Sequence, residues 1–388
     1  MASIKLRGDT SGEITIQAPA VAGTTTLNLP ATSSTLATTA QTEAIYNSLG
    51  VRNLIINGDM RIAQRGTSSS GITGSGIYLI DRFNISGNGY GTFTMSQDTD
   101  VPSGQGFSNS LKLDCTTANA SLSASNHMVI VQRIEGQNLQ HLKFGTSSAE
   151  KLTVSFWVKS NKTGTYTNEF YATDGPRHIN KEFTINSADT WEKKIIIVDG
   201  DTSGVINNDN GSGLEWLIWL AAGTDFTSGT LHTSWDTANN TDRASSSNVN
   251  LADSTSNYIN ITGVQLEVGD TATPFEHRPW DMELVRCQRY FQRLPENVEY
   301  LTSFYFDNTS RYCTTVYFPV IMRTSSQTIA YGTAEYRNGS TYTNGTYLNN
   351  QRRNNLITIR ITCPSAPDSS GYALGLRLIG TWTLDAEL

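Results

Sequence analysis

The sequence is poor in charge. Charged residues make up 16% of the 388 residues, against about 25% in ordinary soluble domains. Their place is taken mainly by serine, threonine, asparagine and glycine, with 32 glycines in all. Acidic residues outnumber basic ones by 35 to 28, which gives a net charge of -7. This balance argues against nucleic-acid binding, because contact with a phosphate backbone requires clustered lysine and arginine.

The sequence also lacks long apolar segments. Runs such as 195–198 and 217–222 are far shorter than the roughly 20 residues that cross a bilayer as a helix. The first five residues, MASIK, show no apolar core of the kind found in a signal peptide. We therefore expect no membrane insertion and no export by such a signal.

Cysteine clusters and catalytic motifs are missing as well. The four cysteines are scattered and form no C-x-x-C pair, which excludes zinc-ribbon sites and favours buried free thiols. No G-x-S-x-G, H-E-x-x-H or phosphate-loop motif occurs. Glycoside hydrolysis needs two carboxylates facing one sugar, and the sequence does not bring its candidates Asp174, Glu182 and Glu215 together. We expect a protein that is not an enzyme, with a polysaccharide depolymerase as the less favoured alternative.

Alternating apolar and polar residues recur along the chain and predict β-strands. The clearest are 155–159, 195–198 and 258–261. Residues 214–220 are apolar on both faces, as in a strand inside a sandwich. Short strands are also predicted at 4–6, 14–16 and 26–29. Strands of this length and spacing predict an all-β protein built on a two-sheet sandwich.

Helical periodicity occurs only twice. Thr38 and Gln41 form a capping box for a short helix that ends near Gly50. A second helix is predicted over 281–294, with Asp281 as its N-cap and Pro295 after its end. One face of that helix is expected to be buried, and it carries Leu284, Cys287, Phe291 and Leu294.

Several stretches resemble parts of known proteins. Residues 53–60, NLIINGDM, resemble the opening strand of jelly-roll carbohydrate-binding modules. Residues 261–280, which include ITGVQLEVG and PFEHRPW, resemble the closing strand and exit of such modules in bacteriophage tail fibres. Residues 283–291 resemble the helix that joins that module to a C-terminal tip domain. The strands SFWVK (155–159) and TWEKK (190–194) resemble two middle strands of the same module.

Residues 1–40 resemble an N-terminal β segment of structural proteins of marine phages, especially phages of cyanobacteria. The combined resemblance implies a homotrimeric virion protein, attached to other tail or capsid proteins through residues 1–40 and contacting host surface polysaccharide. A purely structural virion appendage without a glycan site is the alternative. The resemblance also implies a structural calcium near the first and last strands of the jelly roll, with Asp59 and Glu267 as candidate ligands.

The expected organisation follows from the strand pattern and the resemblance together. It comprises an N-terminal attachment segment (1–40), a helical connector (41–52) and a jelly-roll domain (53–280). A linker helix (281–295) and a C-terminal β tip domain (296–388) follow. The N-terminal strands have too little chain to form their own core, and the tip domain is small and rich in tyrosine and phenylalanine. Both features favour a core shared between chains, as in a trimer.

Tryptophans provide the candidate glycan site. Aromatic rings stack on the apolar face of a sugar, while amides and carboxylates bind its hydroxyls. Trp216 and Trp219 are three residues apart in one strand, so one of them faces away from the core. Trp235 has no apolar neighbours in sequence, so it either anchors a loop on another subunit or forms a binding platform. The candidate glycan-binding residues are Trp235, Trp219, Trp216, Asp236, Asn239, Tyr171 and His178.

Overall fold

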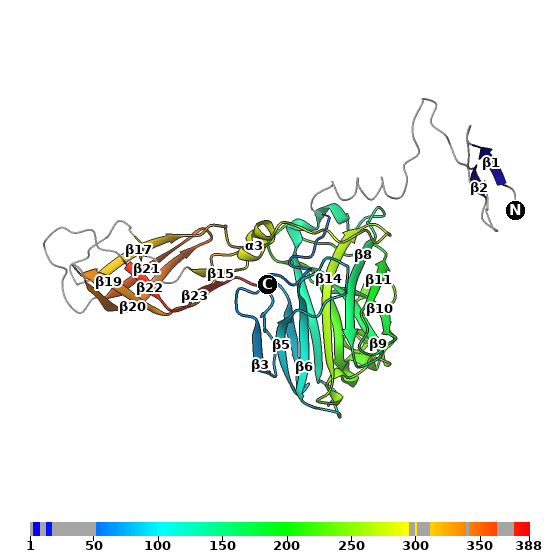
Figure 1. Cartoon of the computed structure of the whole chain (residues 1–388), viewed down its shortest axis with the longest axis horizontal. Coiled ribbons are helices and arrows are strands. Elements are labelled where there is room, and N and C mark those ends of the chain that lie inside the picture. Colours follow the sequence, from blue (N-terminus) through cyan, green and yellow to red (C-terminus); the bar gives the residue numbers. More distant parts are fainter. Residues whose placement is uncertain are drawn as a thin grey trace. The chain divides into compact units, whose positions relative to one another are not determined.

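The computed structural model describes residues 3–7, 13–17, 52–294, 299–300, 311–338, 341–362 and 376–388. The chain divides into two compact units, Met1–Ser48 and Leu49–Leu388 (Figure 1). In the first unit, β1 (Ser3–Arg7) and β2 (Glu13–Gln17) pair antiparallel, in agreement with the two predicted strands. The strand predicted at 26–29 and the helix predicted over 38–50 lie outside the described residues.

The larger unit begins with a sandwich of two six-stranded antiparallel sheets, formed by residues that are all described (Figure 1). In spatial order, the first sheet consists of β13 (Asp236–Thr237), β10 (Arg177–Ile185), β9 (Gly164–Ala172), β12 (Ser212–Ala222), β7 (His127–Glu135) and β4 (Asn84–Asn88). The second consists of β11 (Glu192–Val198), β8 (Leu152–Ser160), β14 (Tyr258–Val268), β6 (Ser110–Thr117), β5 (Thr92–Asp98) and β3 (Ser68–Ile72). The three clearest predicted strands lie within β8, β11 and β14.

The strand order is that of a jelly roll. From β6 to β9 the chain alternates between the sheets, and after the β9–β10 hairpin it crosses to β11, β12 and finally β14. The late strands insert between early ones, because β12 lies between β7 and β9, and β14 lies between β6 and β8. Eight strands connected in this way form the two Greek keys that define the jelly roll. The predicted all-β sandwich is therefore confirmed, with β3, β4, β5 and β13 as additions at the sheet edges.

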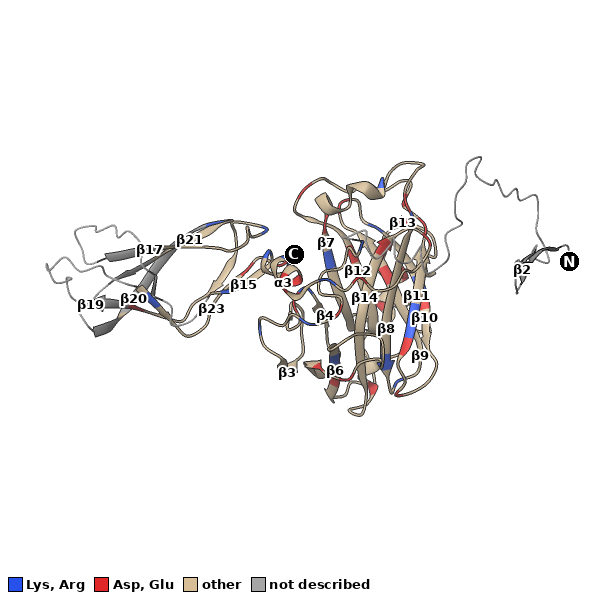
Figure 2. Ribbon diagram, turned by 45° about the horizontal axis from the view of Figure 1, so that its top comes forward, with Lys and Arg blue, Asp and Glu red and all other residues tan. Residues whose placement is uncertain are grey.

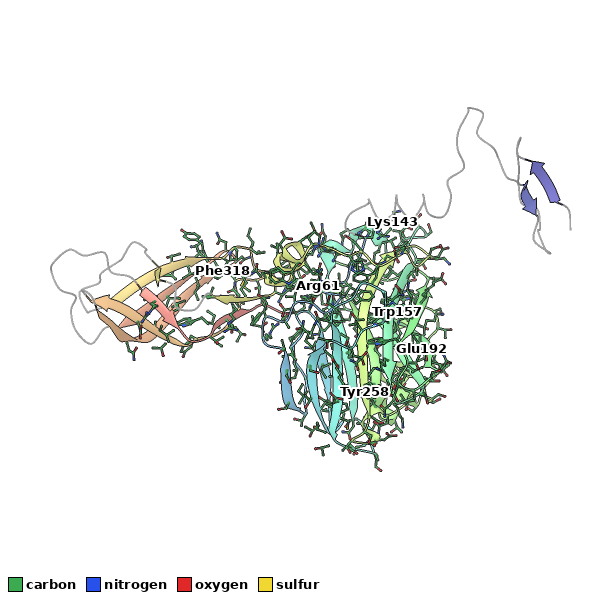
Figure 3. The ribbon with its side chains drawn as sticks, viewed as in Figure 1. Arg61, Lys143, Trp157, Glu192, Tyr258 and Phe318 are labelled. Atoms are coloured by element: carbon green, nitrogen blue, oxygen red, sulfur yellow. The ribbon has the colours of Figure 1, made fainter. Side chains whose placement is uncertain are left out.

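The core lies between the two sheets and follows from the two-residue period of the strands. Trp216 of β12 is fully buried there and meets Phe83 and Phe156 edge-on, with ring centroids 6.5 and 5.8 Å away. On the second sheet, Trp157 of β8 points outward beside the core residue Phe156 and is half-buried (Figure 3). Short helices lie in the connections: η1 (Gly136–Asn138), η2 (Gln140–Leu142), α2 (Thr224–Thr227), η3 (Asn240–Asp242) and η4 (Leu251–Asp253).

Residues 53–60 do not form the regular strand that the resemblance implied. They follow β14 irregularly instead, with hydrogen bonds from Leu54 N to Leu266 O and from Val264 N to Gly58 O, 2.8 and 2.9 Å. A side chain at position 58 would come within 2.0 Å of the Val264 carbonyl oxygen, so only glycine fits this approach. Residues 53–60 thus lie along β14, the last strand of the sandwich.

The second predicted helix is shorter than expected. Helix α3 runs over Trp280–Gln288 with Pro279 as its N-cap, so Asp281 lies in the first turn rather than at the cap. Phe291 and Leu294 belong to strand β15 (Phe291–Leu294), which pairs with β23 (Trp382–Asp385). The spacing of Phe291 and Leu294 is compatible with a helix face and with a short strand. These residues form a strand because they pair with β23.

The C-terminal part is also all-β. Among the described residues, one sheet has the order β15, β23 and β18 (Thr328–Ala330). The other has the order β16 (Glu299–Tyr300), β22 (Leu376–Ile379), β19 (Thr333–Asn338), β20 (Thr341–Arg353), β21 (Leu356–Thr362) and β17 (Arg311–Tyr317). Leu376 and Leu378 of β22 and Trp382 and Leu384 of β23 are buried, although the two strands belong to different sheets and are separated at Gly380 (φ +74°). No helix of the described chain has the length and apolar character needed to cross a membrane.

Candidate binding site

The outer face of the first sheet carries an apolar cluster of its own. Along β12, Trp216 points into the core, whereas Leu217 and Trp219 point outward. Val129 and Val131 of β7 join them on this face. The prediction that Trp216 and Trp219 face opposite sides of one strand is therefore confirmed.

A hollow of about 140 Å³ lies over this cluster. Val129, Val131, Leu217 and Trp219 form its floor. Its walls are polar and consist of Ser86, His127, Arg133, Glu215 and Arg243. We call it the sheet-face hollow. A cavity of about 150 Å³ accepts one benzene ring, so the sheet-face hollow has room for a single six-membered ring.

Two ion pairs form the charged walls. Glu215 and Arg133 are opposite each other on β12 and β7, with Arg133 Nε 2.6 Å from Glu215 Oε1. Arg243 contacts Glu169 of β9 through Nε and Nη2, at 2.9 and 3.1 Å. Within the described residues, one terminal nitrogen of each arginine makes no hydrogen bond, Nη2 of Arg133 and Nη1 of Arg243. The hollow therefore presents unpaired donors while its net charge stays balanced. Figure 2 shows basic and acidic residues on both sheets.

Trp219 is held rigidly in the floor. Its indole N–H donates to Glu169 Oε2 at 2.8 Å, and the Phe226 and His127 rings lie 5.2 and 5.9 Å from its ring. Although burial opposes ionisation, Arg243 and His178 keep the pKa of Glu169 below its usual value, so Glu169 stays charged. Burial lowers the pKa of His127 and leaves that ring neutral at pH 7. A floor that is already rigid loses little conformational entropy when a ligand binds.

The structure separates the predicted glycan-binding residues. Trp219 lines the sheet-face hollow, and Tyr171 lies beside it with its ring 4.9 Å from the Arg243 guanidinium carbon. Trp216 is in the core, where no sugar reaches it. His178 is also fully buried, with Nδ1 3.1 Å from Glu169 Oε1.

The remaining predicted residues lie around β13 and do not line the hollow. Trp235 is half-buried by its own chain: its indole N–H donates to Asp199 O at 2.6 Å, and its ring meets Phe144 edge-on at 5.4 Å. Asp236 is exposed and faces His232, at 3.5 Å. Asn239 caps η3. The tertiary neighbour Phe144, 91 positions away in sequence, is why the sequence alone gave Trp235 no apolar contact.

The two candidate calcium ligands have separate partners. Asp59 forms an ion pair with Arg61, which lies close to α3 in Figure 3, and burial raises the pKa of Asp59. The Glu267 carboxylate accepts hydrogen bonds from Thr273 N and Oγ1, at 2.8 and 2.6 Å. Calcium requires six to eight oxygen ligands, and within the described residues no three acidic, histidine or cysteine side chains gather as a metal site. Asp59 and Glu267 are thus engaged by other protein groups, and the calcium that the resemblance implies stays a prediction.

The sequence patterns did not indicate Arg133 and Arg243 as site residues. They indicated Glu215 only as a candidate carboxylate for glycoside hydrolysis. Arg133 follows Val131 and Gln132 in β7, and Glu215 lies between Leu214 and Trp216 in β12. Such residues mark an outward-facing position, so a signal was present. The register that pairs Arg133 with Glu215 is a tertiary property, and Arg243 arrives from a loop without any sequence signal.

No family model matches this sequence, and no curated protein matches it. Among solved structures, it is similar to the enzymatically active domain of tailspike protein 4 of bacteriophage CBA120, at 13% identity over 56% of this chain and 21% of that chain, with a TM-score of 0.30. The structure of a Bacteroides thetaiotaomicron protein gives 13% identity over 56% of this chain and 100% of that chain, with a TM-score of 0.32. TmCBM61, solved with beta-1,4-galactotriose, gives 9% over 56% and 99%, TM-score 0.30. The jelly-roll assignment rests on the strand order of this chain and not on these matches.

Proposed function

We propose that this chain is a phage tail fibre or receptor-binding protein that recognises a host surface glycan without cleaving it. We place the recognition of one sugar ring in the sheet-face hollow. The observation that carries this proposal is the apolar floor of the hollow, ringed by fixed donors and acceptors. The resemblance of residues 261–291 to the exit of phage tail-fibre modules supports the virion role.

The chemistry of the hollow suits a neutral sugar. A pyranose has an apolar C–H face, which would lie over the floor of the hollow, and a rim of hydroxyls. Those hydroxyls both donate and accept, so they match a wall that offers guanidinium N–H groups beside the Glu215 carboxylate. An acidic sugar would bring its carboxylate against Glu215, which is unfavourable.

A non-catalytic role is supported by the partners of the candidate acids. Glu215 is paired with Arg133 at 2.6 Å. Asp174 accepts hydrogen bonds from Asn207, at 2.8 and 2.9 Å, and Glu182 accepts one from Ser245. Each carboxylate thus belongs to a different side-chain contact, whereas glycoside hydrolysis requires two that face the same bond.

We further propose that the chain is a homotrimer that attaches to other virion proteins through residues 1–40. A hollow that holds one ring buries little area, so each site binds weakly. Three sites on one particle restore useful strength through avidity. Exposed apolar side chains on α3, namely Trp280, Met282 and Val285, support further burial against another copy.

A purely structural appendage is the second candidate, and one observation favours it. Trp219 is only 1% exposed, so its ring is largely covered by this chain itself. In that case the outer-face cluster serves stability alone and the hollow stays empty of sugar.

Binding to a glycan array separates the two candidates. Ser86→Tyr places a ring in the hollow from the edge strand β4 without replacing a residue of either ion pair, and Ser86 is half-buried. Asn88→Tyr, on the same face of the same strand but outside the hollow, is the matched control. We expect the wild type and Asn88→Tyr to bind the same neutral glycans equally and Ser86→Tyr to bind them clearly more weakly. No binding by the wild type, or unchanged binding by Ser86→Tyr, contradicts the proposal.

A further inference from the structure

A second and larger hollow lies where the sandwich meets the C-terminal strands. Its volume is about 300 Å³, roughly twice that of the sheet-face hollow. The edge strand β3 contributes Ser68 and Ser69, the segment 76–79 contributes another side, and Asp385 of β23 closes it. We call it the joint groove.

The polar groups of the joint groove combine a fixed charge pair with free hydroxyls. Arg65 Nη2 lies 2.9 Å from Asp385 Oδ2 and 3.4 Å from Glu387 Oε1. The Arg65 guanidinium carbon lies 3.7 Å from the centroid of the Phe291 ring, which holds it in place. The hydroxyls of Ser68 and Ser69 make no hydrogen bond with any residue of the described chain, so they are available to a ligand.

The apolar side of the joint groove is formed by Ile77, Leu79 and the ring of Tyr78. An apolar surface next to hydroxyls and a neutralised charge pair is the combination that defines the sheet-face hollow. The charge of Arg65 is compensated by Asp385 and Glu387, so the groove has no excess positive charge to attract an anion. Its chemistry therefore suits a neutral, hydroxyl-rich ligand, and its volume suits two rings where the first hollow suits one.

The two hollows share a wall. The hydroxyl of Tyr78, whose ring lines the joint groove, donates to Leu388 O at 3.0 Å and accepts from Arg133 Nη1 at 3.1 Å. Arg133 itself lines the sheet-face hollow. A few residues earlier, Ser75 Oγ lies 3.3 Å from Ser86 Oγ, and Ser86 also lines the sheet-face hollow. Segment 75–78 thus separates the two sites.

We infer that the joint groove is a second carbohydrate site, which binds a disaccharide unit of a neutral glycan. The class of ligand rests on the proposed function, whereas the site is formed by different residues. Because segment 75–78 contacts both hollows, one glycan-bearing surface can engage both sites of the same chain.

Stoichiometry measured by titration calorimetry tests this inference. The probe is a disaccharide taken from the glycans that the array identifies, too short to fill both hollows at once. Ser69→Tyr places a ring in the joint groove, and Ser70→Tyr, exposed on the same strand and outside the groove, is the matched control. Circular dichroism and the melting temperature verify that each variant folds.

We expect two disaccharides per chain for the wild type and Ser70→Tyr, and one for either Ser69→Tyr or Ser86→Tyr. The double variant should bind none. A wild type with one site that Ser86→Tyr abolishes and Ser69→Tyr leaves intact overturns the inference while the proposed function stands. Loss of all binding in Ser69→Tyr alone overturns the sheet-face site instead. A wild type that binds no sugar overturns both.

Discussion

Arg82 and Glu387 form an ion pair that is almost fully buried where the last residues of the chain meet the sandwich. Their side chains are 1% and 5% exposed, and the Arg82 guanidinium carbon lies 3.5 Å from the centroid of the Tyr290 ring. Although burial opposes the charge, Glu387 keeps the pKa of Arg82 above its usual value. Residues far apart in sequence are thus tied together by one desolvated contact, in which each charge depends on the other.

Removal of Glu387 should therefore destabilise the whole larger unit. Glu387→Ala leaves the Arg82 charge buried without its partner, which costs about 3–5 kcal/mol in comparable cases. We expect a lower urea midpoint for this variant. Asp199→Ala removes an exposed partner of Lys151, with side chains 76% and 51% exposed, and should leave the midpoint unchanged. Equal changes in the urea midpoint for the two substitutions would show that the buried pair contributes no more to stability than the exposed pair.

The stability of the protein should depend on the protonation of Asp81. Burial raises the pKa of Asp81 to about 7, although Gln64 and Arg65 partly oppose the shift. Because the folded pKa lies above the ordinary value, the fold favours the protonated carboxyl. Its contribution is complete below about pH 4 and is lost as the pH rises to about 7. The rise of the Asp81 pKa on folding corresponds to about 4 kcal/mol, as an order of magnitude.

Asp81→Asn isolates this effect. The variant cannot ionise, so its free energy of unfolding should fall less than that of the wild type between pH 5 and pH 8. Urea unfolding at both pH values gives the comparison. Parallel pH profiles for the two proteins would mean that Asp81 does not titrate in this range.

Much of the sandwich could be predicted because its signals are local. Alternation along β8, β11 and β14 comes from burial of one strand face, and it survives in any single sequence. The opposite orientation of Trp216 and Trp219 followed from the same two-residue period. The end of α3 could not be predicted in this way, since the choice between helix and strand at Phe291 is made by pairing with β23.

The candidate site was only partly accessible from the sequence. Trp216 and Trp219 were both candidates, because the two-residue period places them on opposite faces of one strand without deciding which face is the outer one. The Arg133–Glu215 pair depends on the register of β7 against β12, and Trp235 depends on Phe144 for its burial. Contacts of this kind arise only when distant segments are packed together, so no local pattern encodes them.

Trp216 and Trp235 should respond very differently to truncation. Trp216→Ala opens a cavity in a fully buried core and should cost about 3–5 kcal/mol. Trp235 is half-buried at the edge of the core, so Trp235→Ala should cost clearly less and should leave glycan binding at the sheet-face hollow intact. Urea unfolding and the glycan array supply the two measurements. Loss of glycan binding in a stable Trp235→Ala protein would show that the glycan site lies in the loop at 233–237 and not in the sheet-face hollow.

Phe291 and Asp281 give a second contrast, which tests the corrected end of α3. Phe291 is 4% exposed and lies under the Arg65 guanidinium, so Phe291→Ala should cost about 3–5 kcal/mol. Asp281 is exposed and does not cap the helix, so Asp281→Ala should change stability by no more than about 0.5 kcal/mol. A large effect at Asp281 would show that it caps the helix after all. The melting temperature of each variant provides the measurement.

The proposed trimer makes the last prediction. Trp280, Met282 and Val285 of α3 are 55%, 48% and 49% exposed, and exposed apolar side chains close together usually contact another surface. Sedimentation at micromolar concentration should give roughly three times 42.4 kDa. Val285→Lys should shift the protein toward lower mass, because a lysine buried without a partner is costly. Val205→Lys, at a residue 60% exposed in the sandwich, is the control and should sediment like the wild type. A stable wild-type monomer would contradict the trimer, and an unchanged trimer in Val285→Lys would place its interface away from α3.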